Sequence, residues 1–404
     1  MNRYEKALEL DKVLDMLATE TGWEEPAALA RSLEPSSRLS EVQRLLDETG
    51  AAYMLTARFG SPSFGQAKNV TNSLRRAAAG ASLSLRELLD IAETLRVIRS
   101  LAEWRSHCAG VETCLDDRFS VLTPNKHLEN RITAVVMSED EIADSASPEL
   151  NTIRRKMRAA SSRIREQLDK MIRSPAYQKL LQDPIVTIRS GRFVVPVKAE
   201  HRGEVPGLVH DTSASGATVF VEPMAAVEAN NELKVLASRE EAEIERIIAE
   251  LSAEAGGFAD AVIADYQILV EINLIFAKAR LAYRMKAVMP RVTDDGHILL
   301  RKARHPLIDP QKVVPIDVEL GAGFDTLVIT GPNTGGKTVT LKTLGLLTLM
   351  AECGLHIPAD DGSVVSVFDS VLADIGDEQS IEQSLSTFSS HRSEEHTSEL
   401  QSQR

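Results

Sequence analysis

A glycine-rich segment, residues 326–343 (TLVITGPNTGGKTVTLKT), constrains the fold of this chain more than any other stretch. Thr326–Thr330 is a short apolar, β-branched run of the kind that forms a buried parallel strand. Residues 331–338, GPNTGGKT, then match the pattern G-x-x-x-x-G-K-T in full, and an apolar helical pattern runs from Val339 to Cys353. Strand, glycine loop and helix in this order predict a P-loop in an α/β domain.

The residue types of this loop suit phosphate chemistry. Glycines let backbone N–H groups curl around a phosphate, and the positive end of the following helix adds to the attraction. Lys337 is expected to reach the β and γ phosphates, and Thr338 to offer its hydroxyl to Mg²⁺. The alternative is a chance glycine turn with a surface lysine. The sequence therefore predicts ATP and Mg²⁺ as cofactors, held by Gly331, Pro332, Asn333, Thr334, Gly335, Gly336, Lys337 and Thr338.

Composition narrows the class of protein. The 404 residues predict two to four domains, and no apolar run approaches the 18 residues of a membrane span. The N-terminal segment lacks the apolar core of a signal peptide. Three cysteines without metal-ligand spacing fit a reducing cytoplasm. A net charge of −13 excludes a globally basic nucleic-acid coat, so any contact with a polyanion must be local.

Residues 1–183 are predicted to be almost entirely helical. Helical spacing is clear in residues 84–104, where Ser84 and Glu87 fit a capping box. Residues 149–173 carry eight Lys or Arg against three acids and predict one long helix with a thin apolar stripe. Its basic face is interpreted as the solvated side of an antiparallel helix pair, and a nucleic-acid-facing surface is the alternative.

Composition changes at Pro184, and residues 185–222 are rich in β-forming residues. Ser190-Gly191 between two β runs predicts a hairpin turn. This β module is locally basic, and its basic side chains either contact nucleic-acid phosphates without reading bases or only keep the module soluble. The candidate nucleic-acid-binding residues are Arg189, Arg192, Lys198 and Arg202.

Helical patterns resume at Pro223 and continue to Pro290, interrupted at Gly256-Gly257. Four acids in the first of these helices could be mistaken for a metal cluster, but acids crowded on a helix usually form a solvated face. They are Glu240, Glu241, Glu243 and Glu245. From Pro290, short strands and turns lead into the P-loop, so the ATPase boundary is placed near residue 290.

The opening of the loop, Thr330-Gly331-Pro332-Asn333, resembles the MutS family of ATPases. Residues 304–306 (RHP) precede the loop at a suitable distance, and residues 384–391 (SLSTFSSH) are similar to the family's signature segment. The β module resembles the clamp of one bacterial branch, MutS-two. The only Phe-x-Glu, Phe220 to Glu222, lies on a strand pattern, where a buried strand phenylalanine is expected rather than the mismatch-sensing wedge of mismatch-repair MutS.

The resemblance implies a multidomain fold of mostly α core and lever helices with a small β-rich clamp insertion, followed by an incomplete α/β P-loop (ABC-type) ATPase domain. The implied divisions are a helical core at 1–148, a lever helix at 149–183, a clamp at 184–223, returning lever helices at 224–290, the first part of the ATPase domain at 291–391, and a tail at 392–404.

The resemblance also implies a function. It implies a homodimeric ATPase that binds branched DNA and suppresses recombination, or that binds collided ribosomes and splits them. Members of the branch usually end in a Smr domain with nuclease activity, to which no segment here is similar. The alternatives are a nucleotide-gated structural ATPase that organises DNA, mismatch-repair MutS and, more weakly, a small-molecule kinase.

In the family, the signature segment completes the nucleotide site of the opposite subunit, which implies γ-phosphate contacts from Ser386, Thr387 and Ser389. Asp377-Glu378 is a tempting Walker B pair, but Asp374 interrupts the preceding apolar run and Gly376 directly precedes the pair. No catalytic residue is therefore assigned, and the chain is expected to bind ATP without hydrolysing it.

The last residues have an unusual composition. Residues 392–402, RSEEHTSELQS, match the translation of a widely used short-read sequencing adapter. We therefore expect residues 392–404 to be non-native, and a genuine polar tail is the alternative. Sequencing the locus from genomic DNA distinguishes the two.

Overall fold

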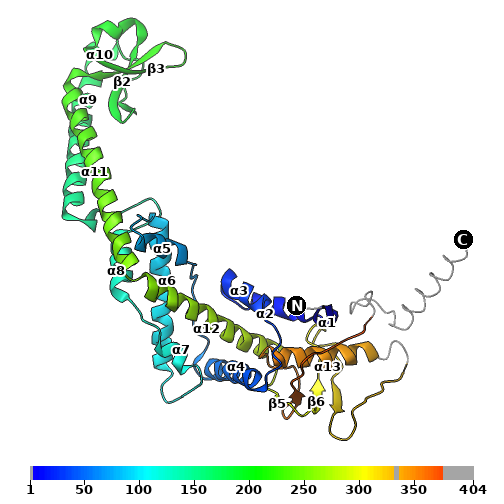
Figure 1. The fold of residues 1–404 in the computed structure, drawn as a ribbon. Coiled ribbons are helices and arrows are strands. Elements are labelled where there is room, and N and C mark those ends of the chain that lie inside the picture. The colour runs from blue at the N-terminus through cyan, green and yellow to red at the C-terminus, as the bar shows by residue number, and fades with distance from the viewer. Residues whose placement is uncertain (1–2, 332–335, 376–404) are drawn as a thin grey trace, which may run out of the picture. The chain divides into compact units, whose positions relative to one another are not determined.

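The computed structural model describes residues 3–331 and 336–375 (Figure 1). By its internal contacts the chain divides into two compact units. The first unit contains Met1–Asn69, Glu93–Lys126 and Asp260–Arg404. The second contains Val70–Ala92 and His127–Ala259. Within the described ranges, no helix combines the length and apolar character needed to cross a membrane.

The first unit is helical with one small sheet. Its helices are α1 (Arg3–Ala7), α2 (Leu10–Thr19), α3 (Glu24–Arg31), α4 (Leu39–Phe59), the later part of α6 (Leu85–His107), α7 (Asp116–Ser120), α12 (Ala259–Met285) and α13 (Lys337–Glu352). Its strands are β5 (Arg291–Thr293), β6 (Ile298–Ala303), β7 (Ile316–Leu320) and β8 (Val364–Ser366). They lie in the order β5-β8-β6-β7, with β5 and β8 parallel and the other pairs antiparallel.

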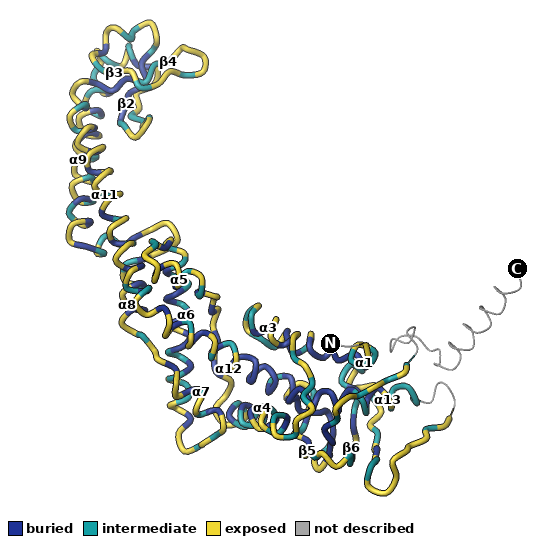
Figure 2. Tube along the Cα trace, in the orientation of Figure 1, coloured by how far each residue is buried: buried dark blue, intermediate teal, exposed yellow. Residues whose placement is uncertain are grey.

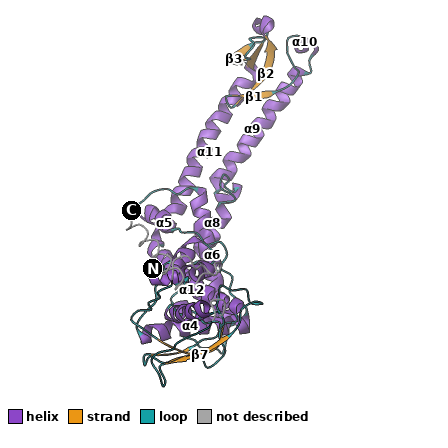
Figure 3. Cartoon of the chain, turned by 90° about the vertical axis from the view of Figure 1, so that its right-hand side faces the viewer, coloured by secondary structure: helices purple, strands orange, loops and turns teal. Residues whose placement is uncertain are grey.

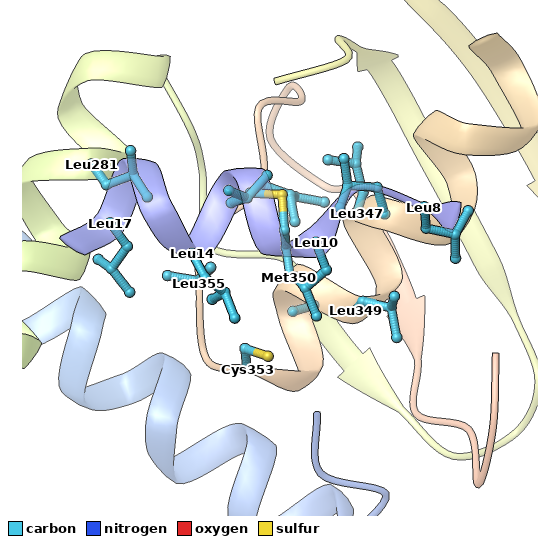
Figure 4. Packing of buried hydrophobic residues seen from close by; sticks show 14 of the residues in the cluster. Leu8, Leu10, Leu14, Leu17, Leu281, Leu347, Leu349, Met350, Cys353 and Leu355 are labelled. Atoms are coloured by element: carbon cyan, nitrogen blue, oxygen red, sulfur yellow. The ribbon is translucent and has the colours of Figure 1, made fainter. Parts of the chain in front are cut away.

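The core of this unit joins its two sequence ends. Leu10, Leu14 and Leu17 of α2 are fully buried against α13 and the sheet, as Figure 4 shows beside Leu347 and Met350. Burying apolar side chains in this way is the main stabilising term in folding. The first 69 residues therefore share a unit with the P-loop helix. Residues 70–92 and 127–148, which the sequence groups with them in one helical core, belong to the second unit.

One element expected around the P-loop is missing. Thr326–Thr330 is not a strand, and the side chains of Leu327 and Val328 are 42% and 76% exposed. An inner strand of a sheet is held by hydrogen bonds to neighbours on both sides, and none of the strands in the described residues pairs with this segment. The prediction of a buried parallel strand here is wrong, whereas the helix after the loop is present as α13.

The second unit combines helices with the β module (Figure 3). Its helices are α5 (Thr71–Ala78), the first part of α6, α8 (Lys126–Val135), η1 (Asp144–Ala146), α9 (Pro148–Ile172), α10 (Pro175–Gln178), η2 (Ala199–Glu204) and α11 (Met224–Gly257). Its strands are β1 (Thr187–Arg189), β2 (Arg192–Lys198), β3 (Gly207–Thr212) and β4 (Thr218–Pro223).

The helices α9 and α11 form the antiparallel pair expected for the basic segment. Arg154 on α9 pairs with Glu240 on α11 at 2.6 Å, and Arg163, further along α9, pairs with Glu232, further back along α11. Ile153, Ile164 and Leu168 are buried along α9 while most other positions are exposed (Figure 2). The helix pair confirms the interpretation of residues 149–173 as a long, largely solvated helix.

The acids of α11 only partly follow the expected solvated face. Glu243 is buried, and its Oε1 accepts a hydrogen bond of 2.6 Å from Ser147, the N-cap of α9. The hydrogen bonds from Arg246 and Ser147 lower the pKa of Glu243 to about 2. The expectation of four solvated acids is wrong at Glu243, which joins the two helices.

The β module is an antiparallel sheet in the order β1-β2-β4-β3. Arg189 pairs with Arg192 across the predicted hairpin, and Ser190 and Gly191 between them both have positive φ, 50° and 73°. Two consecutive residues with positive φ are the mark of a type I′ turn, which matches the twist of the strands. The hairpin predicted from Ser190-Gly191 is therefore confirmed.

Candidate nucleotide-binding site

The P-loop helix begins directly at the candidate lysine. Gly336, at φ 78°, precedes α13, and Lys337 and Thr338 are its first two residues. A helix start leaves its first backbone N–H groups without partners inside the helix, and it carries partial positive charge. This end of α13 is thus a site where a phosphate group would find unpaired donors.

The side chain of Lys337 contacts the first residue of the glycine motif. Lys337 Nζ donates a hydrogen bond of 2.7 Å to the carbonyl oxygen of Gly331, which has φ 148°. Among the described residues this ammonium group donates to one backbone carbonyl, and a phosphate oxygen would be a stronger acceptor. Gly331 and Lys337 are therefore in contact at the start of α13.

The other predicted nucleotide-site residues lie outside the described residues. They are Pro332, Asn333, Thr334 and Gly335 of the loop, the signature residues Ser386, Thr387 and Ser389, and the pair Asp377-Glu378. The segment 392–404 lies outside them as well. The structure therefore places Gly331, Gly336, Lys337 and Thr338, and it brings Gly331 and Lys337 into contact.

Two buried lysines hold α13 and the residue that follows it, and the sequence did not indicate either contact. Lys342 is almost fully buried and its Nζ donates to Glu9 Oε2 at 3.0 Å. At the other end, buried Lys278 of α12 donates to the carbonyl oxygen of Cys353 at 2.7 Å. Burial lowers the pKa of Lys278 to about 8 and raises the pKa of the Cys353 thiol to about 12. A buried lysine looks like any surface lysine in sequence, so no signal marked these two residues.

The Arg304-His305-Pro306 motif lies at a cavity of about 230 Å³ in the first unit. His305 is buried, and burial lowers its pKa to about 4, so the ring is neutral at pH 7. Its Nδ1 accepts a hydrogen bond of 3.4 Å from the N–H of Leu307. Arg304 donates to the carbonyl oxygen of Lys286 at 2.8 Å. Arg304 therefore ties the segment after β6 to the residue that follows α12.

The four basic residues predicted to contact nucleic acid are placed in different surroundings. Arg192 donates to the fully buried carboxylate of Glu222 at 2.7 and 3.0 Å. Arg189 lies 4.3 Å from the ring centre of Phe220. Lys198 and Arg202 each donate to a backbone carbonyl, of Lys179 and Gly207 respectively, at 3.2 Å.

These surroundings separate Arg192, which pairs with a buried carboxylate, from three cations for which no such buried partner is found among the described residues. Arg192 neutralises Glu222, which also accepts from Asn230 and contacts His210. The side-chain amide of Asn230 in turn accepts a hydrogen bond from the backbone N–H of Phe193 and donates one to the backbone carbonyl of Phe193. Phe220, expected to be buried on its strand, is half-buried under Arg189. Whether these cations bind nucleic acid stays a prediction.

Comparison with known proteins supports the sequence resemblance. Residues 327–402 match the family model for MutS domain V, a range that runs into the segment predicted to be non-native. Over 389 residues the chain is 49% identical to a protein named Endonuclease MutS2 from Acetivibrio thermocellus, and over 393 residues it is 46% identical to one of the same name from Brevibacillus brevis. Each likeness covers 96% of this chain and 49% of the relative, so the chain spans about half the length of these relatives.

The matched domain and the glycine loop at the start of α13 are those of a MutS-type protein. The likeness extends from this domain over nearly the whole chain, including the helix pair and the β module. The chain belongs to the MutS2 branch of the MutS family.

Proposed function

We propose that this chain binds ATP with Mg²⁺ at the start of α13, as the nucleotide-binding part of a MutS-type ATPase. The observation that carries the proposal is the hydrogen bond from Lys337 to the carbonyl oxygen of Gly331 beside the first turn of the helix. The first-turn N–H groups and the Lys337 ammonium would hold the phosphates, and the Thr338 hydroxyl would ligate Mg²⁺. When bound, the metal would neutralise phosphate charge.

Calorimetry with the 404-residue chain tests this proposal. Lys337→Ala should weaken ATP binding strongly while the circular dichroism spectrum stays unchanged, since the contact of Lys337 with Gly331 is exposed. Lys312→Ala removes an exposed lysine of the same unit and is the matched control. Equal affinity of the Lys337→Ala variant and the unmodified chain would remove the P-loop assignment.

The wider role proposed for the protein rests on its relatives. We infer a cytoplasmic homodimer that acts on nucleic acid, since the similar proteins are named endonucleases. Branched DNA and the RNA of collided ribosomes are the proposed targets, with the β module as the contact. All three cysteines are free, which fits a reducing compartment. A salt dependence that is steep and nearly independent of nucleic-acid sequence would support phosphate contacts by this module.

A further inference from the structure

The junction between α1 and α2 holds an unusual residue. Glu9 has φ 64° and ψ 31°, a left-handed conformation that side chains other than glycine rarely adopt. It is also 5% exposed, although an ionised carboxylate is costly to bury. Strained residues persist only where their surroundings over-determine them, and they gather at functional sites. The contacts of Glu9 therefore indicate which part of the fold depends on this strained conformation.

Two lysines surround the carboxylate of Glu9. Its Oε2 accepts from Lys342 Nζ at 3.0 Å, and its Oε1 accepts from Lys12 Nζ at 2.6 Å. Burial alone would raise the pKa of Glu9, but the hydrogen bonds from Lys12 and Lys342 outweigh burial and lower it. Glu9 is thus ionised and bound directly to α13.

The residue before Glu9 makes a second contact with the same helix. Leu8 packs against Gly345, where a Cβ atom would lie 2.8 Å from the Leu8 methyl groups. Lys342 and Gly345 are three residues apart, so they lie on one face of α13. Two adjacent residues of the junction therefore fix one face of the helix, one by charge and one by close packing.

This face lies close to the phosphate end of α13. Lys342 follows Lys337 by five residues, which corresponds to about 7.5 Å along a helix. A rotation or shift of α13 about this contact would move both Lys337 and the first-turn N–H groups. A small displacement of these N–H and ammonium groups would weaken the interactions that they make with a bound phosphate.

We propose that Glu9 is a positioning residue for the phosphate-binding helix, acting through its ion pair with Lys342. The inference rests on the proposed function, since it assumes that the start of α13 binds nucleotide. A charge pair is not needed for packing alone, because apolar residues of similar volume stabilise a core as well. The pair instead sets one orientation of α13, and the left-handed backbone of Glu9 aims its carboxylate at Lys342.

The test compares variants that keep the volume of the site. Glu9→Gln combined with Lys342→Met removes both charges of this ion pair. Glu9→Asp keeps the charge, relaxes the left-handed backbone and draws the carboxylate back from Lys342. Glu112→Gln, at an exposed position of the same unit, is the control. Thermal melts, ATP affinity by calorimetry and hydrogen exchange at residues 337–341 are measured for each.

Both Glu9 variants should melt close to the unmodified chain, bind ATP on the order of tenfold more weakly and exchange faster at 337–341 without nucleotide. Unchanged hydrogen exchange at residues 337–341 in the Glu9 variants would overturn the inference, whether or not ATP binds. If the unmodified chain does not bind ATP, that result counts only against the proposed function. Folded variants with unchanged affinity would overturn it as well. Variants that unfold would make Glu9 a structural residue and would also overturn it.

Discussion

The backbone N–H of Phe368 donates a hydrogen bond of 3.0 Å to the buried carboxylate of Glu352, the last residue of α13. The backbone carbonyl oxygen of Glu352 accepts a hydrogen bond of 3.2 Å from the N–H of Ser36. One residue thus links the end of the P-loop helix to a segment before it and a segment after it. Burial raises the pKa of Glu352 to about 7, against the lowering effect of the Phe368 bond.

This raised pKa predicts a pH dependence of stability. Below pH 4.5 the carboxyl is protonated in both the folded and unfolded states and has no effect. Between pH 4.5 and about 7 only the unfolded state loses the proton, so the free energy of unfolding falls as pH rises. Glu352→Gln keeps an oxygen for Phe368 and removes the titration, so it should raise stability at pH 8 by on the order of 1–3 kcal/mol.

Urea unfolding at pH 5 and pH 8 measures this change. The gain from Glu352→Gln should be present at pH 8 and small at pH 5. Glu112→Gln, at an exposed position, should give no such difference and serves as the control. Equal stability of Glu352→Gln and the unmodified chain at pH 8 would contradict a raised pKa of Glu352 in the folded state.

The β module offers a prediction that separates folding from binding. Arg192→Ala leaves the carboxylate of Glu222 buried without its strongest partner and should destabilise the second unit by about 3 kcal/mol. Arg189→Ala removes a more exposed side chain and should change stability by less than about 1 kcal/mol. Urea unfolding of the two variants measures both values.

Binding then separates the same residues. If Arg189, Lys198 and Arg202 contact phosphates, replacing each by Ala should lower the salt slope of nucleic-acid binding by about 1. A triple variant with the slope of the unmodified chain would exclude the β module as the contact. Loss of binding in Arg192→Ala alone would instead be traced to the stability change.

Local patterns predicted local structure well in this chain. Ser84 Oγ accepts from Glu87 N–H and Glu87 accepts from Ser84 N–H, as the capping box requires. The Ser190-Gly191 hairpin and the helix after the glycine loop also follow from nearby residues. In each case the residues that decide the structure lie within a few positions of each other.

Contacts between distant segments could not be read in the same way. Glu9 and Lys342 are 333 positions apart, and each alone looks like a surface residue. The sequence predicts Arg192 as one of four candidate nucleic-acid contacts, because it does not tell which acid is buried beside this arginine. The strand expected at Thr326–Thr330 fails for a related reason, since a strand depends on neighbours as well as on its own residues.

Assembly gives a further prediction, from the signature segment of the family. If Ser386, Thr387 and Ser389 contact the γ phosphate of the opposite subunit, ATP should tighten a homodimer by mass action. Ser386→Ala should reduce this effect, while Lys337→Ala should abolish it together with ATP binding. Light scattering with and without saturating ATP measures the assembly, and a monomer under both conditions would count against a nucleotide-linked dimer.

The chain should bind ATP without hydrolysing it. Hydrolysis needs an acid in the Mg²⁺ shell at the end of a buried strand and a further group that positions water. Asp377-Glu378 does not follow an apolar run, because Asp374 and Gly376 interrupt it. The segment before the glycine loop, Thr326–Thr330, is not part of a sheet that could bring such an acid to Lys337.

Phosphate release at steady state should therefore equal that of Lys337→Ala. Release that Glu378→Gln abolishes, in a variant that still binds ATP and melts like the unmodified chain, would show that this pair does catalyse hydrolysis.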